Sequence, residues 1–241
     1  MKKIALIFCF AMSCALVFGQ SISTNPNISI KWTPAGLAFG NLGLQAEYNF
    51  GKNSLTAKIG IPVSKHQTFK YDDKDADFTM KDMNFLAGYR TYLSKKHMAG
   101  LYFEPYFKYL HHTAEGVGNA VLSGENVVMN FTNEYNGVGV GAQLGIQFLI
   151  KKKIVIDFFF LGPEINSARN DFKANEISNT PPWTQSQATE AEQDIRDFIK
   201  KFPFIRNKMD VMVDANQKIV TASFKGVLPG YRIGVSFGIA F

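Results

Sequence analysis

Cysteine is nearly absent from this 241-residue chain, and its two copies lie close together. Cys9 and Cys14 both fall in an apolar run at residues 4–18, directly after Lys2 and Lys3. A short basic start followed by an apolar run of this length is typical of a secretory signal peptide. We predict a signal peptide at residues 1–19, cleaved before Gln20. The mature chain would then hold no cysteine, which excludes disulfides, thiol nucleophiles and cysteine-bearing metal sites.

Long apolar runs are also missing after residue 19, and the mean hydropathy is only −0.06. A membrane-spanning helix needs about 20 consecutive apolar residues. The chain nevertheless contains 22 phenylalanines and 20 glycines. A transmembrane β-barrel conceals its apolar surface in this way, because every second residue of each strand faces the polar interior.

A strong charge of one sign is absent as well. The formal net charge is +6, and loss of Lys2 and Lys3 with the signal peptide would leave 24 basic against 20 acidic residues, or +4. The basic residues form no stripe and no nucleic-acid-binding motif. We therefore predict no nucleic-acid partner.

The last eleven residues alternate strictly between two kinds of side chain. One parity is apolar and consists of Tyr231, Ile233, Val235, Phe237, Ile239 and Phe241. The other is small or polar and consists of Arg232, Gly234, Ser236, Gly238 and Ala240. Such alternation predicts a strand with one apolar face. The pattern recurs along the chain with no second set of elements to cover these faces, so we favour a barrel in lipid over a soluble β-sandwich.

The alternation and the turn signals between its repeats predict an all-β fold, an eight-stranded antiparallel up-and-down transmembrane barrel. The predicted strands cover residues 27–38, 42–50, 54–61, 82–93, 98–110, 127–150, 154–168 and 219–241. The predicted long loops cover residues 64–80, 111–125 and 170–218.

Short and long connections alternate, which is the asymmetry of bacterial outer-membrane barrels, with short turns in the periplasm and long loops at the cell surface. The chain ends on Phe241, and a terminal aromatic after an amphipathic strand resembles the signal by which such barrels are recognised for assembly. These features predict an integral protein of the cell outer membrane. Its expected partners are membrane lipid, lipopolysaccharide and, during biogenesis, the barrel-assembly machinery.

Taken together, the strands resemble the small eight-stranded outer-membrane barrels, the class of OmpX, OmpW and the transmembrane domain of OmpA. The junction Gly19-Gln20 and the phrases Gly88-Tyr89-Arg90 and Gly230-Tyr231-Arg232 are similar to those of uncharacterised small barrels of Bacteroidetes. The resemblance spans the predicted mature chain and implies a fold and a location in the outer membrane.

Eight charged residues fall on the inward parity of their predicted strands. An eight-stranded barrel is just wide enough to be filled by side chains, and buried charges persist only when they are paired. We therefore interpret these residues as a charge-paired plug, with a narrow polar conduit as the alternative. They are Lys31, Lys58, Arg90, Lys108 and Arg232, with Glu47, Glu104 and Asp157.

The longest predicted loop contains a helical pattern at about residues 185–202. Thr184 to Gln187 has the form of a capping box, and acidic residues precede basic ones in the segment that follows. The helix is either a lid packed on its own loop or the barrel rim, or a surface that docks a partner protein. The residues proposed for partner docking are Ile195, Phe198, Ile199 and Phe202.

Catalytic and metal-binding patterns are weak. His111-His112 and Ser123 share a predicted loop, but no motif joins a nucleophile, a base and an orienting acid. The acidic run at residues 72–77 lacks the glycine and terminal glutamate of a calcium loop. We predict no cofactor and no metal. The expected role is non-enzymatic, in envelope structure or partner binding; the alternatives are a small-solute channel and, with less support, a lipid-modifying enzyme.

Overall fold

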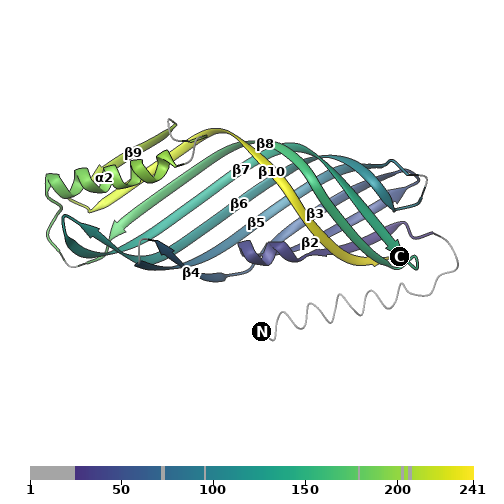
Figure 1. Cartoon of the computed structure of the whole chain (residues 1–241), viewed down its shortest axis with the longest axis horizontal. Coiled ribbons are helices and arrows are strands. Elements are labelled where there is room, and N and C mark those ends of the chain that lie inside the picture. The colour runs from purple at the N-terminus through teal and green to yellow at the C-terminus, as the bar shows by residue number, and fades with distance from the viewer. Residues whose placement is uncertain (1–24, 72–73, 95, 179, 202–203, 206–207) are drawn as a thin grey trace.

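The structure is a computed structural model, and it describes residues 25–71, 74–94, 96–178, 180–201, 204–205 and 208–241. The predicted signal peptide lies outside these residues. Eight strands form a ring in which each pairs antiparallel with its neighbours, and β1 pairs with β10 to close it (Figure 1). The predicted eight-stranded antiparallel barrel is thereby confirmed. The ring strands are β1 (Ile28–Thr33), β2 (Asn41–Phe50), β3 (Asn53–Pro62), β5 (Lys74–Tyr92), β6 (Gly100–Leu122), β7 (Glu125–Ile150), β8 (Ile154–Glu176) and β10 (Ile219–Ala240).

The seam of the ring lies between the first and last strands. Four residue pairs join β1 to β10, from Ser29 opposite Ala240 to Trp32 opposite Phe237. Phe241 extends the seam, because its backbone N–H donates to the carbonyl oxygen of Ile28 at 2.8 Å. The chain therefore ends against its own first strand.

The first strand is shorter than the prediction of residues 27–38. It ends at Thr33, and Pro34 begins a 3-10 helix, η1 (Pro34–Phe39). Proline has no N–H for the ladder and its fixed φ suits the start of a helix. Gly40, with φ of +85°, then reverses the chain into β2.

The wall of the barrel is much taller on one side than on the other. β2 and β3 have 10 residues each, whereas β6, β7, β8 and β10 have 23, 26, 23 and 22. A bilayer needs only about 9–11 residues per strand. The long strands therefore continue past the short ones as a curved sheet, which we call the extension.

The extension corrects two of the predicted loops. Residues 64–80 contain β4 (Lys65–Tyr71), paired with the first half of β5, and residues 111–125 are the tip of the β6–β7 hairpin, paired as far as Leu122 and Glu125. β8 also runs beyond 168, as far as Glu176. The remaining connection holds the helix α2 (Gln185–Lys200) and the strand β9 (Met209–Asp214), which pairs with β10.

The sequence predicts loops for these segments because the side chains that mark the two faces of the sheet change character along the long strands. The change is clearest on β7, where the same parity faces outward throughout. Its outward residues are Val138, Val140 and Leu144 toward the short turns, but Thr132 and Glu134 in the extension. The inward residues change in the opposite sense, from glycine and glutamine to Val127, Met129 and Phe131.

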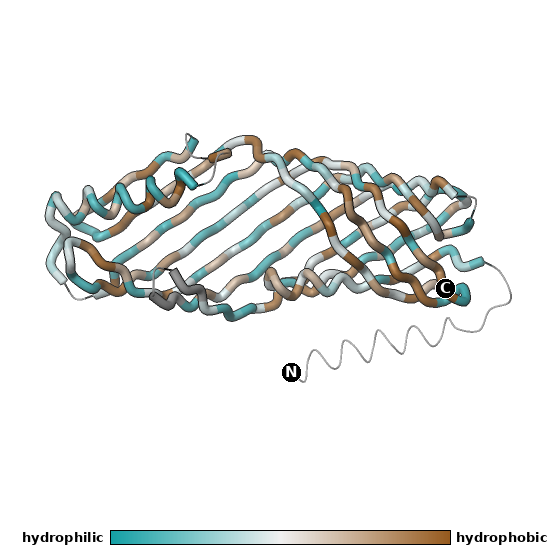
Figure 2. Tube along the Cα trace, in the orientation of Figure 1, coloured by the Kyte–Doolittle hydropathy of each residue, from teal (hydrophilic) through white to brown (hydrophobic). Residues whose placement is uncertain are grey.

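The ring half of the molecule has an apolar outer surface. Val140, Ile165 and Ile233 are 61%, 60% and 67% exposed. Hydrophobic residues recur along the strands toward the end that carries the C-terminus (Figure 2). Among the described residues no helix has the length and hydrophobicity to cross a bilayer.

The extension has a core of its own, on the inner face of the sheet. α2 lies against this face near the far end of the molecule, beside β9 (Figure 1). Buried apolar side chains from the tip of β6–β7, from β8 and from β10 pack there with the helix. They are Leu122, Val127, Met129, Ala174 and Val220, with Trp183, Ala188 and Ala191.

Candidate functional site

The lumen of the ring is filled by a charge network, which we call the plug. Its cations are Lys31 and Arg90, its carboxylates are Glu47, Glu104 and Asp157, and all five side chains are fully buried. The Lys31 ammonium donates to Glu47 and to Asp157 at 2.9 Å each. Since two cations meet three carboxylates, the plug has a formal surplus of one negative charge.

Arg90 connects the three carboxylates. Its guanidinium nitrogens lie 2.7 Å from Glu104, 3.0 Å from Asp157 and 3.5 Å from Glu47. The guanidinium carbon lies 3.6 Å from the centre of the Tyr102 ring, in a cation–π contact. Burying each ion costs several kcal/mol, which only good geometry and complete hydrogen bonding offset. The arrangement around Arg90 meets both requirements.

Neutral side chains complete the network. The Tyr92 and Tyr102 hydroxyls donate to Glu47 and Asp157 at 2.6 and 2.7 Å, and the Gln147 amide oxygen accepts from both Lys31 and Arg90 at 2.8 Å. Gly145 leaves space for the Tyr102 ring, because a Cβ at Gly145 would lie 2.3 Å from it. The small residues on the inner parity therefore make room for large polar ones.

The other three predicted lumen residues lie in a second group, the upper layer, between the plug and the extension. Lys108 forms a salt bridge with Glu164. Strict alternation along the sequence does not place Glu164 in the lumen. Asp82 was also missed, and it accepts hydrogen bonds from Asn41 and Asn84. Lys58 and Arg232 form no salt bridge within the described part of the chain. Counting both groups, five cations match five carboxylates in the lumen.

Glu164 was missed because β8 contains a β-bulge. Asp157 faces inward, so strict alternation places residue 164 outside. Phe160 and Leu161 are instead both exposed, at 43% and 48%, and the register with β7 and β10 shifts by one residue there. One extra residue moves every later side chain to the opposite face. Glu164 therefore points into the lumen, and only its sequence neighbour Gly162 hinted at an irregular strand.

The helix predicted at 185–202 is present as α2, and its capping box is confirmed: Thr184 accepts from the backbone of Gln187 and the Gln187 side chain accepts from Thr184. The four residues proposed for docking differ in how far they are buried. Ile199 is buried and Ile195 packs against the core of the extension, whereas Phe198 is 49% exposed. Phe202 lies outside the described residues.

A buried carboxylate anchors the segment that leads into α2. Glu176, at the end of β8, accepts hydrogen bonds from Thr180, from the Trp183 indole N–H at 2.5 Å and from Lys218 at 3.3 Å. Burial by itself raises the pKa of Glu176, but these hydrogen bonds outweigh it and hold the pKa below its ordinary value. The anchor is therefore strongest when Glu176 is ionised.

A second contact fixes α2 to the opposite wall of the extension. Glu190 accepts hydrogen bonds from the backbone N–H and the hydroxyl of Ser123, at 2.7 and 2.9 Å. Ser123 occupies the turn between β6 and β7 with a positive φ of 50°. α2 thus bridges from β8 and β10 to the β6–β7 tip, as a lid across the inner face of the extension.

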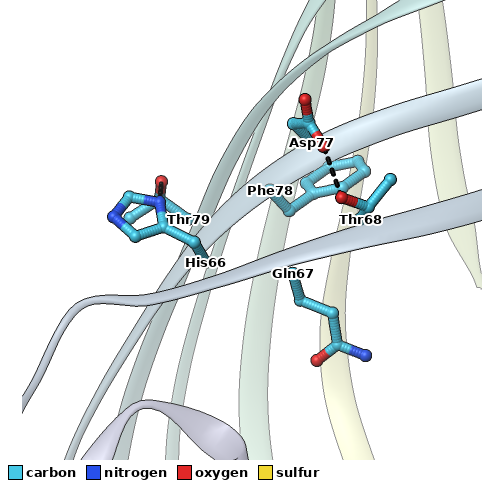
Figure 3. A pocket seen from close by; sticks show the side chains of 6 residues that line it. All are labelled: His66, Gln67, Thr68, Asp77, Phe78 and Thr79. Atoms are coloured by element: carbon cyan, nitrogen blue, oxygen red, sulfur yellow. Dashed lines mark hydrogen bonds between the residues drawn. The ribbon is translucent and has the colours of Figure 1, made fainter.

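A hollow of about 310 Å³ lies between β4 and β5 (Figure 3). On it, His66 Nδ1 lies 2.9 Å from the Thr79 hydroxyl, and the Thr68 hydroxyl donates to Asp77 at 2.6 Å. A threonine beside a histidine has the first two parts of a nucleophilic site, which also needs an acid to orient the base. No hydrogen bond or salt bridge joins a carboxylate to His66 in the described structure. The hollow therefore does not form a catalytic constellation.

His97 and His111 each contact an asparagine. His97 contacts Asn27 beside the seam, far along the chain from the hollow at His66, and His111 contacts Asn136 on the neighbouring strand. No group of three His, Cys, Asp or Glu side chains suited to a metal ion occurs among the described residues. The lumen charges therefore form the most extensive polar network among the described residues.

No protein-family model matches the chain, and no curated protein matches its sequence. A solved structure, that of Acinetobacter baumannii CarO, aligns with 91% of this chain and 100% of its own, with 10% sequence identity and a TM-score of 0.42. A likeness at this score carries no argument about how the two proteins work.

Proposed function

We propose that this protein is a non-enzymatic, integral outer-membrane barrel whose lumen is closed by the plug and whose extension stands on the cell surface. The observation that carries this proposal is the combination of an apolar exterior with five fully buried, mutually paired charges inside. An apolar outer face suits lipid, and a polar interior suits a barrel in lipid. In this position the protein contributes to envelope structure or presents its lid to a partner.

Conductance across a planar lipid bilayer tests the closed lumen. The wild-type barrel should give no steady current, because the charged side chains of the plug are fully buried and fill the lumen. Sustained channels in the wild type would contradict a closed lumen and favour a small-solute channel. Purification with an inactive control barrel of similar size excludes contaminating porins as the source of any current.

Cysteine labelling tests the orientation, because the described chain has no cysteine of its own. Met212, in β9, is 67% exposed on the extension, and Lys152 lies in the exposed turn between β7 and β8. A membrane-impermeant maleimide added to intact cells should label Met212→Cys but not Lys152→Cys, while both react after lysis. The reverse pattern would place the extension in the periplasm.

The exposed side of α2 is the surface we propose for a partner. Phe198 is exposed, whereas Ile199 next to it is buried in the lid. A Phe198→Ser variant should retain barrel stability but lose any stoichiometric protein that copurifies after mild detergent extraction from the native membrane. An unchanged complex would remove α2 as the docking surface and leave a structural role.

A further inference from the structure

Two cations of the upper layer, Lys58 and Arg232, form no direct ion pair in the described part of the structure. Lys108 is satisfied by Glu164, but neither Lys58 nor Arg232 forms a salt bridge with any described residue. Arg232 projects from the inner face of β10 and Lys58 from the inner face of β3. Five charges meet in this layer, of which three are positive, so its formal surplus is one positive charge.

The Arg232 side chain is held in place by aromatic rings, although one of its nitrogen atoms has no hydrogen-bond partner among the described residues. Its guanidinium carbon lies 4.5 Å from the centre of the Phe159 ring and 5.4 Å from that of Tyr106, so two aromatic faces hold the group in place. Its Nη1 atom is buried and has no hydrogen-bond partner. Buried polar atoms without partners are rare and point to a bound group or water.

The charge on Arg232 acts on Lys58. Arg232 repels the Lys58 ammonium and Asp82 attracts it, so two cations share the influence of one carboxylate. Asp82 is itself held by Asn41 and Asn84. Lys58 and Arg232 face the lumen and are nevertheless partly exposed, whereas the plug side chains beneath them are fully buried. Solvent therefore reaches the two cations and stops at the plug.

We propose that Lys58 and Arg232 form a binding site for a small oxyanion, a carboxylate or a phosphate, at the upper surface of the plug. The guanidinium offers paired N–H donors that match the oxygens of either group, and the lysine supplies a point charge. The surplus negative charge of the plug repels an anion from below, so the site binds an anion without passing it. This inference concerns residues outside the plug, and its test measures binding and not conductance, so its failure is distinguishable from failure of the closed lumen.

Titration of the purified barrel in detergent with inorganic phosphate, and separately with acetate, at constant ionic strength tests the site. The wild type should show a saturable rise in unfolding temperature, because a ligand that binds only the folded state stabilises it. Lys58→Met and Arg232→Gln should each weaken the apparent affinity by about tenfold or more, which is the value of one charge-assisted hydrogen bond. The double variant should show no saturable rise.

Arg169→Gln is the matched control, because Arg169 pairs with Asp171 on the outer face of the extension and its removal should leave the titration unchanged. A rise of equal size in the double variant, or no rise in the wild type with any oxyanion, would overturn the proposal. Nanodiscs with and without an anionic phospholipid identify the source of the oxyanion. Stabilisation by phosphate or acetate alone indicates a free solute, and stabilisation only by the anionic lipid indicates a headgroup.

Discussion

Replacement of Arg90 by alanine is the most direct test of the plug. The wild-type guanidinium lies within salt-bridge distance of Glu47, Glu104 and Asp157, and Lys31 contacts only the first and last of these. The substitution leaves three buried carboxylates facing one cation. Removing one member of a buried ion pair typically costs about 3–5 kcal/mol, because the remaining charge is buried without compensation.

The expected loss for Arg90→Ala is therefore about 3–5 kcal/mol in the free energy of unfolding. It is measured by equilibrium urea unfolding in lipid vesicles, followed by the fluorescence of Trp32 and Trp183. Arg169→Ala is the control: its salt bridge with Asp171 is exposed to solvent, so its loss should change the free energy of unfolding little.

A compensating substitution separates electrostatics from lost packing. Arg90 is the only cation that forms a salt bridge with Glu104 in the described structure, so Glu104→Gln in the Arg90→Ala background removes the most isolated carboxylate. The double variant should recover part of the lost stability. If Arg90→Ala costs no more than the control, or if Glu104→Gln makes the variant worse, the plug does not hold the barrel together as we describe.

Three further predictions address the exterior and the lid. Val140→Arg should prevent stable insertion into lipid vesicles, at a cost of about 2–4 kcal/mol. Thr132→Arg, on the same outward face of β7 but in the extension, should insert normally in the same assay. Equal behaviour of the two variants would show that the two halves of β7 do not face different solvents. The stability that Glu176 gives the lid is fully present above its unfolded-state pKa of about 4.3 and lost as the pH falls through its lowered folded pKa. Trp183 fluorescence should report lid loosening at acidic pH, and Glu176→Gln should remove this dependence; a wild-type signal that ignores pH would refute the anchor. Glu190→Ala should raise the hydrogen-exchange rate of α2 amides without changing barrel stability, and unchanged exchange would mean that the contact with Ser123 does not restrain the lid.

Much of the ring could be predicted from the sequence, because in lipid the outer face must be apolar and alternation with period two is then easy to recognise. The strand at 231–241 and the glycine-rich stretch of β7 show it most clearly. Five of the eight lumen charges predicted by parity meet in the plug. Periodicity predicts on which face of the sheet a side chain lies, but only the pairing of the strands shows which charged groups are in contact.

Two kinds of feature could not be predicted. The bulge at Phe160 and Leu161 leaves no clear mark in the residues themselves, yet it moves Glu164 from the outer face to the lumen. The prediction of loops at 64–80 and 111–125 is wrong because the extension has polar outward residues and apolar inward residues, which is the pattern of a soluble sheet and not of a barrel in lipid. The predicted strands at 127–150 and 219–241 nevertheless cover β7 and β10 almost completely.

The place where the code reverses is set by pairing and not by any single strand. Outward residues Phe85, Tyr109 and Val138 are mutual partners on β5, β6 and β7, and they are aromatic or apolar. Two positions further into the extension, the outward partners His111, Asn136, Arg169 and Lys225 on β6, β7, β8 and β10 are all polar.

Between these two rows β6, β7 and β10 change from Tyr109, Val138 and Val227 to polar residues, whereas β8 is already polar one row earlier, at Ser167. The parity that faces outward is unchanged on β7 throughout. Side chains follow the solvent on each side, so an outer face that becomes polar marks the level where lipid gives way to water. Below that row the outer face is apolar, so the inner face must be polar. If both faces were apolar, a shift of one residue in the strand register would cost little free energy. Above it the inner face can bury apolar residues beneath α2. The plug and the lid are therefore two consequences of one boundary, and the upper layer with Lys58 and Arg232 lies between them.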